Sequence, residues 1–225
     1  MAVNKLSPVL ADVITMMCNA SFAEGKLTVP SDLKSALVCP RLKKSILDPD
    51  DMTSYRPISN LSFISKTLER LVAKRFIGHA EKYKLLSNRQ SAYRYHHSTE
   101  TAVVAVHNNL VRAIDDHNVS ALVLLDLSAA FDTVDHDILL NVIETRFGVG
   151  GDALKWFQSY LSGRSQTFQV GVEQSGPYTV TCSVPQGSVL GPQEFIAYTE
   201  DLSWCIDQHG IQHYICADDI QLTAS

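Results

Sequence analysis

The stretches Ala121-Leu-Val-Leu-Leu-Asp126 and Tyr214-Ile-Cys-Ala-Asp-Asp-Ile220 decide the fold class of this 225-residue chain. In each, a short apolar run leads into a carboxylate, which predicts a buried strand that ends in aspartate. Such a carboxylate is costly to bury unless a cation lies beside it. If the two strands are neighbours, Asp126, Asp218 and Asp219 form an oxygen-ligand site for Mg²⁺ and substrate phosphates. The pattern predicts metal-dependent phosphoryl or nucleotidyl transfer; the alternative is a set of solvated turn residues.

The composition is that of a folded protein, with 45% hydrophobic and 19% charged residues. No apolar stretch approaches the roughly 18 residues that a membrane helix needs, so no membrane partner is expected. The N-terminal residues lack the apolar segment of a signal peptide. The cysteines are odd in number, widely spaced and without a CxxC pair. They favour reduced, intracellular thiols over a disulfide framework or a zinc site.

Charge is distributed unevenly along the chain. Through Arg94 there are 15 Lys and Arg against 8 Asp and Glu, and from Tyr95 onward there are 4 against 16. A basic part beside an acidic part suits a protein that holds nucleic acid with one and metal with the other. On charge alone, chance or solubility explains the pattern equally well. We expect a seam near residues 90–100, between lobes of residues 1–94 and 95–225.

Apolar periodicity predicts the elements. Helices are expected at about Ser7–Ala23, Leu61–Lys84, Thr99–Asp116, Asp135–Phe147, Asp152–Ser162 and from Val184–Ser188 to about Ser203. Besides the strand that ends at Asp126, strands are expected at Ser35–Cys39, Tyr55–Ile58, Gln166–Val172 and Tyr178–Cys182. The last two of these are expected to pair with each other. A final hairpin is expected over Tyr214–Thr223, with its turn at Asp218-Asp219. In the acidic half this order, β-α-α-β-β-α-β-β, predicts an α+β fold with helices on one face of an antiparallel sheet.

Five motifs follow one another in a recognisable order. Asp126-Leu-Ser-Ala-Ala-Phe131-Asp-Thr-Val-Asp-His136, Val184-Pro-Gln-Gly-Ser-Val-Leu-Gly-Pro192 and Cys216-Ala-Asp-Asp219 resemble the central motifs of reverse transcriptases from LINE-type (non-LTR) retrotransposons. Upstream, Asp51-Met-Thr-Ser-Tyr-Arg-Pro-Ile-Ser-Asn-Leu61 and Gln90-Ser-Ala-Tyr-Arg-Tyr-His-His-Ser-Thr-Glu-Thr-Ala102 resemble that family's finger motifs. Each motif alone is weak, but five in order make a specific signal. The resemblance extends from about Ser31 to Leu222.

The resemblance implies a right-hand polymerase fold. Residues 1–94 would be an N-terminal extension and the fingers, and residues 95–225 a palm that is truncated after the Asp-Asp hairpin, with the thumb absent. The implied activity is RNA-directed DNA polymerisation from dNTPs on an RNA template with a DNA primer. A nuclear location is also implied, as are thumb and endonuclease regions in a longer polyprotein. Two alternatives are an inactive relic of a truncated element and a palm that binds nucleic acid without extending it.

The resemblance also implies roles for the acidic residues. Asp126 and Asp218 would hold two Mg²⁺ ions, with Mn²⁺ as an alternative ion, and the Leu127 carbonyl would be a further ligand. Asp219 would support the site from the second position of the Asp-Asp pair. In this family an aromatic residue usually precedes Ala217, but here the residue is Cys216.

The remaining roles concern the nucleotide and the template. Phe131 would be a steric gate against a ribose 2′-hydroxyl, although most Phe are core residues. Gln186 and Gly187 would lie beneath the nucleotide and template base, or form merely a turn before a helix. Arg56 would bind the triphosphate, with Lys43 or Lys44 as a second cation. The alternative for these residues is a solvated basic loop. Arg94 would contact the template backbone. Gln193-Glu194 departs from the family, which usually has two apolar residues there.

Overall fold

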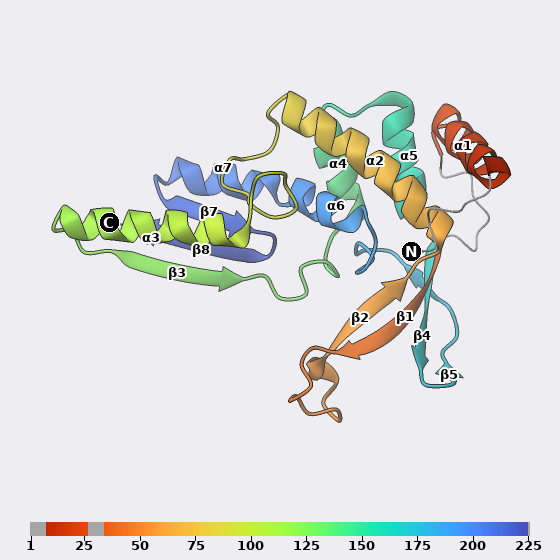
Figure 1. Cartoon of the computed structure of the whole chain (residues 1–225), viewed down its shortest axis with the longest axis horizontal. Helices are drawn as coiled ribbons and strands as arrows, with labels where there is room; N and C mark the ends of the chain where they lie inside the picture. Colours follow the sequence, from red (N-terminus) through yellow and green to blue (C-terminus); the bar gives the residue numbers. More distant parts are fainter. Residues whose placement is uncertain (1–7, 27–33, 225) are drawn as a thin grey trace.

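The computed structural model describes residues 8–26 and 34–224 (Figure 1). The helices are α1 (Pro8–Ala23), α2 (Phe63–Lys82), α3 (Thr99–Asp115), α4 (His136–Thr145), α5 (Gly151–Leu161), α6 (Gly191–Tyr198) and α7 (Glu200–Gln208). The strands are β1 (Ser35–Leu42), β2 (Tyr55–Asn60), β3 (Ala121–Asp126), β4 (Arg164–Val170), β5 (Glu173–Gln174), β6 (Tyr178–Val180), β7 (Gln212–Cys216) and β8 (Asp219–Ala224). Ser7 and Ser31, the expected starts of the first helix and of the family resemblance, lie outside the described residues.

The core lies among α2, α4, α5 and α6, at the centre of the molecule (Figure 1). Helix α2 begins where the Ser62 hydroxyl accepts a hydrogen bond from the Ser65 amide, which satisfies one of the open donors of the first turn. Its buried face brings Phe76 to 5.1 Å from Phe147 and 5.7 Å from Phe157, measured between ring centroids. Each buried ring contributes about 1.5–3 kcal/mol, so this aromatic cluster fixes how the helices pack.

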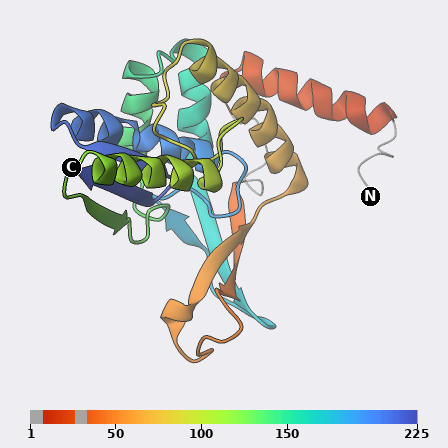
Figure 2. The ribbon, with the colours of Figure 1, turned by 60° about the vertical axis from the view of Figure 1, so that its left-hand side comes forward.

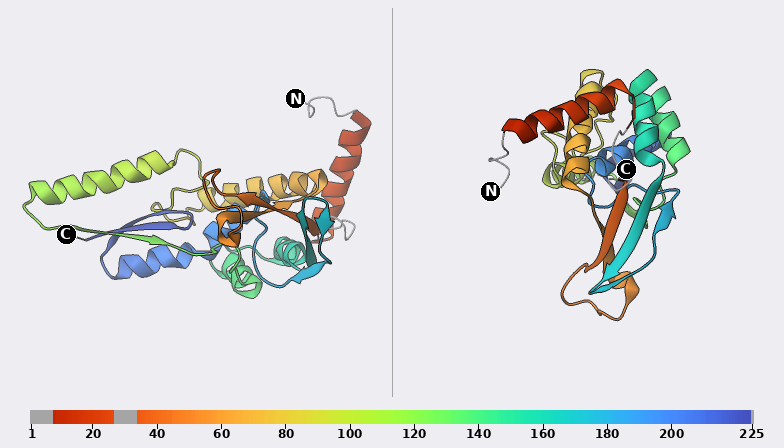
Figure 3. Two further views of the ribbon diagram at one scale, coloured as in Figure 1. Left: turned by 90° about the horizontal axis from the view of Figure 1, so that it is seen from below. Right: turned by 90° about the vertical axis from the view of Figure 1, so that its right-hand side faces the viewer.

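A three-stranded antiparallel sheet, ordered β3-β8-β7, carries the predicted acidic residues. On β7 the buried His213 contacts Ser203 of α7 at 2.7 Å, and the next residue, Tyr214, accepts a hydrogen bond from Asn109 of α3. Neighbouring residues of a strand point to opposite faces. Helices therefore cover both faces of this sheet, as the left view of Figure 3 shows, and the expectation of helices on one face is wrong.

Strand β3 forms where it was predicted, but it is not buried. All of its residues are exposed, and Leu124 keeps 68% of its surface accessible. Among the described residues β3 pairs only with β8, while α3 and α7 lie over β7 and β8 instead. An apolar run predicts a strand from local pattern, but burial depends on what covers the strand.

The second sheet has the order β2-β1-β4-β5, with β6 paired to β4. The predicted antiparallel pairing of the Gln166 and Tyr178 strands is confirmed, with these two residues in register. Both strands belong to the sheet of β1 rather than that of β3, because β4 runs parallel to β1 with Ser165 opposite Ser35, and β6 pairs with β4. Residues about 130 positions apart pair here, and no local pattern reveals such a partner. The β1–β2 hairpin projects away from the helices (Figure 2).

The region expected to form one helix from Val184–Ser188 to Ser203 is divided. A loop extends to Leu190, α6 follows, and the chain breaks at Thr199, whose ψ of 7° separates α6 from α7. The final hairpin turns at Ala217-Asp218, since Cys216 and Asp219 already pair across β7 and β8. Within the part of the chain that the structure describes, no helix has both the length and the apolar character needed to cross a membrane.

Candidate active site

One cleft of about 780 Å³ lies between the β1–β2 hairpin, the end of β3 and the loop before α6. It brings together residues that are far apart in the sequence. The residues assigned to the site from the sequence that line this cleft are Lys43, Arg56, Asp126, Leu127, Phe131, Gln186, Gly187 and Asp218. Lys44, Asp219 and Arg94 do not line it.

The acidic residues meet at the ends of two adjacent strands. Asp126 and Asp219 are directly opposite each other on β3 and β8, and the Leu127 amide donates to the Asp218 carbonyl at 3.2 Å. Asp126 and Asp219 are exposed and Asp218 is half-buried. Among residues 8–26 and 34–224, no hydrogen bond or ion pair engages these three carboxylates. Two free carboxylates therefore face one cleft.

This donor set fits a hard divalent cation that completes its shell with water and substrate phosphates. Asp126, Asp218 and Leu127 all line the cleft, so two carboxylates and the Leu127 backbone are the candidate oxygen ligands. Among the described residues, no group of three or more His, Cys, Asp or Glu side chains lies close enough together to hold a metal ion. A cation at Asp126 and Asp218 would therefore need further ligands from water or from a substrate.

Tyr93 is a cleft residue that the sequence did not single out. It lines the cleft with a φ of 54°, an uncommon value for a residue with a side chain. Burial raises the pKa of its hydroxyl, and the negative charge of Asp218 raises it further. The only available signal was its place in the predicted finger motif, next to Arg94.

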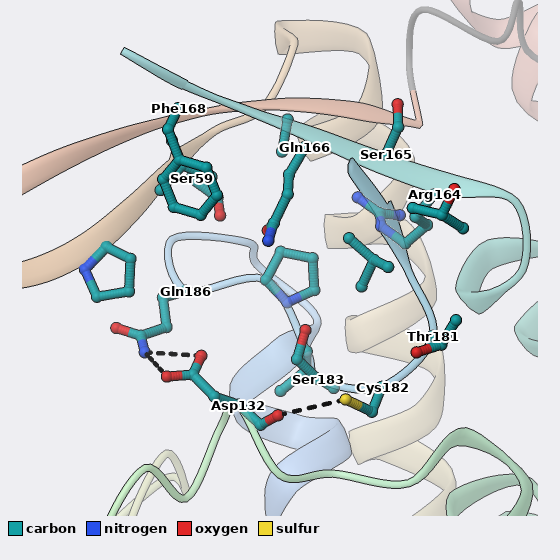
Figure 4. A pocket seen from close by; sticks show the side chains of 17 residues that line it. Ser59, Asp132, Arg164, Ser165, Gln166, Phe168, Thr181, Cys182, Ser183 and Gln186 are labelled. Carbon is teal, nitrogen blue, oxygen red and sulfur yellow. Dashed lines mark hydrogen bonds between the residues drawn. The ribbon is translucent and has the colours of Figure 1, made fainter. Parts of the chain in front are cut away.

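Gln186 is held by Asp132, the residue after Phe131. The Gln186 side-chain amide lies 3.2 Å from each carboxylate oxygen of Asp132, and both residues also line a second cavity of about 320 Å³ (Figure 4). Cys182 on the far side donates through its thiol to the Asp132 carbonyl at 3.7 Å. The pair fixes the direction of the Gln186 amide. Asp132 was not predicted because an acid in an acid-rich segment gives no signal of its partner.

The backbone around position 187 requires a glycine for a reason that lies within the protein itself. Its φ is +102°, and an added Cβ would lie 2.9 Å from the Ser59 carbonyl oxygen. The Ser59 amide in turn donates to the Gln186 carbonyl at 2.7 Å. Only glycine tolerates both this conformation and this approach. The glycine therefore locks the loop to β2, and its predicted place beneath a template base stays a prediction.

Phe131 lies at the border between cleft and core. Its ring stacks on Phe195 of α6, with centroids 4.8 Å apart and an interplanar angle of 16°. It is half-buried and also lines the cleft. Both sequence interpretations, a gate and a core residue, are therefore compatible with one position.

The cations on the cleft come from the β1–β2 hairpin. Lys43 and Arg56 are exposed there, and in the described parts of the chain neither has a carboxylate within ion-pair distance. Lys44 is exposed beside Lys43 but does not line the cleft. Both cleft cations are available to an anionic ligand, with the planar guanidinium suited to paired phosphate oxygens.

Arg94 lies outside the cleft and is engaged within the protein. Its side chain is only 6% exposed and forms a double hydrogen bond with Glu81, at 2.9 and 3.2 Å. It also donates to the carbonyls of Ser87 and Gln90. In this structure the guanidinium therefore serves contacts inside the protein, and its contact with template backbone stays a prediction.

Two further acids lie fully buried behind the loop at residues 184–190. Glu69 of α2 accepts hydrogen bonds from the Val189 amide at 2.6 Å and the Ser65 hydroxyl at 3.0 Å. Glu194 of α6 has no partner for either carboxyl oxygen among the described residues. Burial raises the Glu194 pKa to about 8, with Arg164 opposing the shift and Glu69 adding to it. Burial therefore favours the neutral form of Glu194.

The fold and the site define a class of protein: an α+β chain that presents strand-end carboxylates, a basic hairpin and a glycine loop to one cleft. Residues 42–225 match the family model described as "Reverse transcriptase (RNA-dependent DNA polymerase)". The chain therefore belongs to the reverse transcriptase family. This confirms the resemblance that the five motifs predicted.

Two curated relatives are polymerases of mobile elements from Drosophila melanogaster. The chain is 36% identical over 149 residues to the "Probable RNA-directed DNA polymerase from transposon BS", which covers 66% of this chain and 16% of that protein. It is 31% identical over 179 residues to the "RNA-directed DNA polymerase from mobile element jockey", which covers 77% of this chain and 19% of that protein. These relatives support the predicted LINE-type (non-LTR) affiliation, and the chain spans less than a fifth of their length.

A solved structure shares the fold. The apo telomerase from Candida tropicalis, truncated from its C-terminal domain, superposes with a TM-score of 0.62 over 96% of this chain and 49% of that chain. The identity is 10%, so this likeness concerns the fold alone. It confirms the predicted α+β fold class of polymerase fingers and palm.

Proposed function

We propose that this chain is a catalytic RNA-directed DNA polymerase domain, which joins dNTPs to a primer 3′-hydroxyl on an RNA template. One observation carries the proposal: free carboxylates of Asp126 and Asp218 face the exposed cations Lys43 and Arg56 across a single cleft. Nucleotidyl transfer needs this combination, because a triphosphate must be held by cations while its reacting phosphate meets the primer. Membership of the reverse transcriptase family supports the same reaction.

In this proposal Asp126, Asp218 and the Leu127 carbonyl hold two divalent cations, Mg²⁺ or Mn²⁺, and Asp219 supports them from β8. Such cations, when bound, activate the primer hydroxyl and neutralise charge on the transferring phosphate. The backbone contact between Leu127 and Asp218 keeps the two strand ends in register. The open geometry leaves ligand positions for water and the substrate.

The other cleft residues position the nucleotide. Lys43 and Arg56 bind the triphosphate, with Lys44 available beside them if the hairpin bends toward the ligand. Gln186, oriented by Asp132, contacts the nucleotide or template base. Phe131 restricts the space next to the sugar and so disfavours a 2′-hydroxyl. We extend the proposal to two subdomains, with an N-terminal extension and fingers over residues 1–94 and a palm over residues 95–225. We also extend it to a nuclear location.

The test is extension of a DNA primer on an RNA template by the wild-type chain and by Asp218→Asn. Removing one carboxylate charge from the cation site is expected to lower the rate by about 10³-fold or more, equivalent to about 4 kcal/mol. Asp115→Asn, at the exposed end of α3, is the matched control and should match the wild type. Equal extension by Asp218→Asn would contradict the site assignment.

A wild-type chain that binds primer–template in a salt-dependent manner but never extends it would favour the non-extending alternative. Binding is measured by fluorescence anisotropy at two salt concentrations, alongside the extension assay. Neither binding nor extension would favour the inactive relic.

A further inference from the structure

The finger-motif segment around Gln90 is hydrogen-bonded to the hairpin that carries Asp218. The Ser91 amide donates to the Ile215 carbonyl at 2.8 Å, and the Ile215 amide donates to the Arg89 carbonyl at 2.9 Å. These bonds form a short parallel bridge between Gln90 and Ile215 on the free edge of β7. The segment around Gln90 therefore extends the sheet beyond β7, next to the turn between β7 and β8.

The Gln90 side chain reaches the turn itself. Gln90 is 3% exposed, and its Oε1 accepts hydrogen bonds from the Ala217 amide at 3.2 Å and the Ala92 amide at 2.9 Å. Ala217 has a φ of +59°, a conformation that costs a non-glycine residue of order 1–3 kcal/mol unless its surroundings enforce it. Hairpin turns of this kind usually place glycine here. The Gln90 contact is one of the surroundings that hold the turn.

Arg94 fixes the other side of the same segment. Its guanidinium donates to the Gln90 carbonyl at 3.2 Å while it holds both carboxylate oxygens of Glu81 on α2. A chain of contacts thus runs from α2 through Arg94 and Gln90 to Ala217. The next residue is Asp218, whose carbonyl also receives the Leu127 amide. A shift of the turn therefore displaces the ends of both strands that carry the site.

We propose that Gln90 is a positioning residue for the catalytic turn: its side-chain oxygen holds Ala217 in its left-handed conformation and so places Asp218 against Asp126. The catalytic consequence rests on the proposed function, whereas the effect on the turn does not. The competing interpretation is that Gln90 only satisfies buried amides and contributes to overall stability. The two interpretations differ in whether a Gln90 substitution disturbs only the turn or lowers the stability of the whole protein.

The experiment compares Gln90→Met, which keeps the side-chain length without an acceptor, with Gln90→Glu, which keeps an acceptor oxygen. The first measurement is amide hydrogen exchange by NMR at Ala217, with Leu222 of β8 as an internal reference. Loss of one hydrogen bond is worth about 1 kcal/mol, so Gln90→Met should accelerate exchange at Ala217 by about fivefold to tenfold relative to Leu222. Gln90→Glu should restore the protection, and Gln208→Met, an exposed change on α7, should leave it unaltered.

The second measurement is the affinity for Mn²⁺, by calorimetry without nucleotide. We expect Gln90→Met to weaken binding about tenfold and Gln90→Glu to bind at least as tightly as the wild type. In primer extension, the same Gln90→Met variant should lower kcat with little change in the KM for dNTP. If Gln90→Met does not fold, Gln90→Asn replaces it, because the shorter side chain withdraws the same oxygen from the turn.

Two results would overturn the proposal. One is unchanged Ala217 exchange in a folded Gln90→Met or Gln90→Asn variant. The other is equal acceleration at Ala217 and Leu222, which indicates a general loss of stability. If the wild type neither binds Mn²⁺ nor extends primers, the proposed function fails. The exchange result then still decides whether Gln90 holds the turn.

Discussion

Acidic residues occur in two contrasting environments in this molecule, an open cleft and the buried core. At the strand ends, Asp126 and Asp218 face an open cleft, and among the described residues no cation or donor engages their carboxylates. Behind the glycine loop, Glu69 and Glu194 are fully buried within the core. Water and ligands can reach the cleft acids. The core acids must either be satisfied by donors or lose their charge.

The two core acids show both of these outcomes. Glu69 keeps donors on its carboxylate and thereby ties α2 to the loop after Gly187. Glu194 has no donor among the described residues, and burial raises its pKa to about 8. The comparison teaches that burial alone does not mark a functional acid. What marks the cleft is that unpaired carboxylates coincide with accessible space and opposing cations.

The largest effect is expected at Glu69. Replacement by leucine leaves the Val189 amide, the Leu190 amide and the Ser65 hydroxyl without this acceptor. Unpaired donors at such a site cost about 3 kcal/mol together. Urea unfolding at pH 7 measures this loss of stability. Glu144→Leu on the exposed face of α4 is the control, and a loss below about 1 kcal/mol for Glu69→Leu would show that the loop does not depend on this acid.

A smaller effect of opposite sign is expected at Glu194. Because its pKa rises from the ordinary 4.5 to about 8 on folding, the folded state binds more protons between these pH values. Stability must then fall as the pH rises from about 4.5 to about 8. Glu194→Met removes that penalty without leaving a large void, so at pH 8 the variant should be more stable by about 2 kcal/mol.

The measurement is urea unfolding of the wild type and Glu194→Met at pH 5 and pH 8. Burial also raises the pKa of Glu200 to about 7, so only the difference between the two proteins isolates Glu194. That difference should be small at pH 5 and large at pH 8. A constant difference would mean that Glu194 does not change its charge in this range, and the contrast between cleft and core acids would then weaken.

The sequence predicted those parts of the site that depend on local pattern. The positions of Asp126 and Asp218 followed from apolar runs that end in carboxylates, and both lie on the cleft. The exposure of β3 could not be predicted, because it depends on which helices cover the sheet. The charge that opposes the pKa shift of Glu194 was equally hidden, since Arg164 belongs to a distant strand. The sequence showed only an acid where the family usually has an apolar residue.

Arg94 and Gln90 show the same limit within one motif. Tyr93 of this motif lines the cleft, and the motif assigned the neighbouring arginine to the template. The structure turns that arginine to Glu81, and the motif's glutamine reaches the hairpin turn. A motif records which residues occur together, whereas their contacts depend on how α2 and β7 meet.

Phe131 gives the smallest expected effect and tests where the boundary between the two regions lies. Its ring is stacked on Phe195 in the core and also lines the cleft. Phe131→Leu removes part of both contacts. Loss of the stacked pair should cost about 1 kcal/mol in urea unfolding. If the ring also limits space beside the sugar, ribonucleotide use relative to deoxynucleotide use should rise about tenfold in primer extension.

Phe63→Leu, an exposed aromatic at the start of α2, controls for the loss of a ring. A stability loss with unchanged nucleotide preference would assign Phe131 to the core alone. A changed preference with little loss of stability would assign it to the cleft. Both changes together would show that one ring serves both regions, because the core contact that holds the ring then also sets its distance from the sugar.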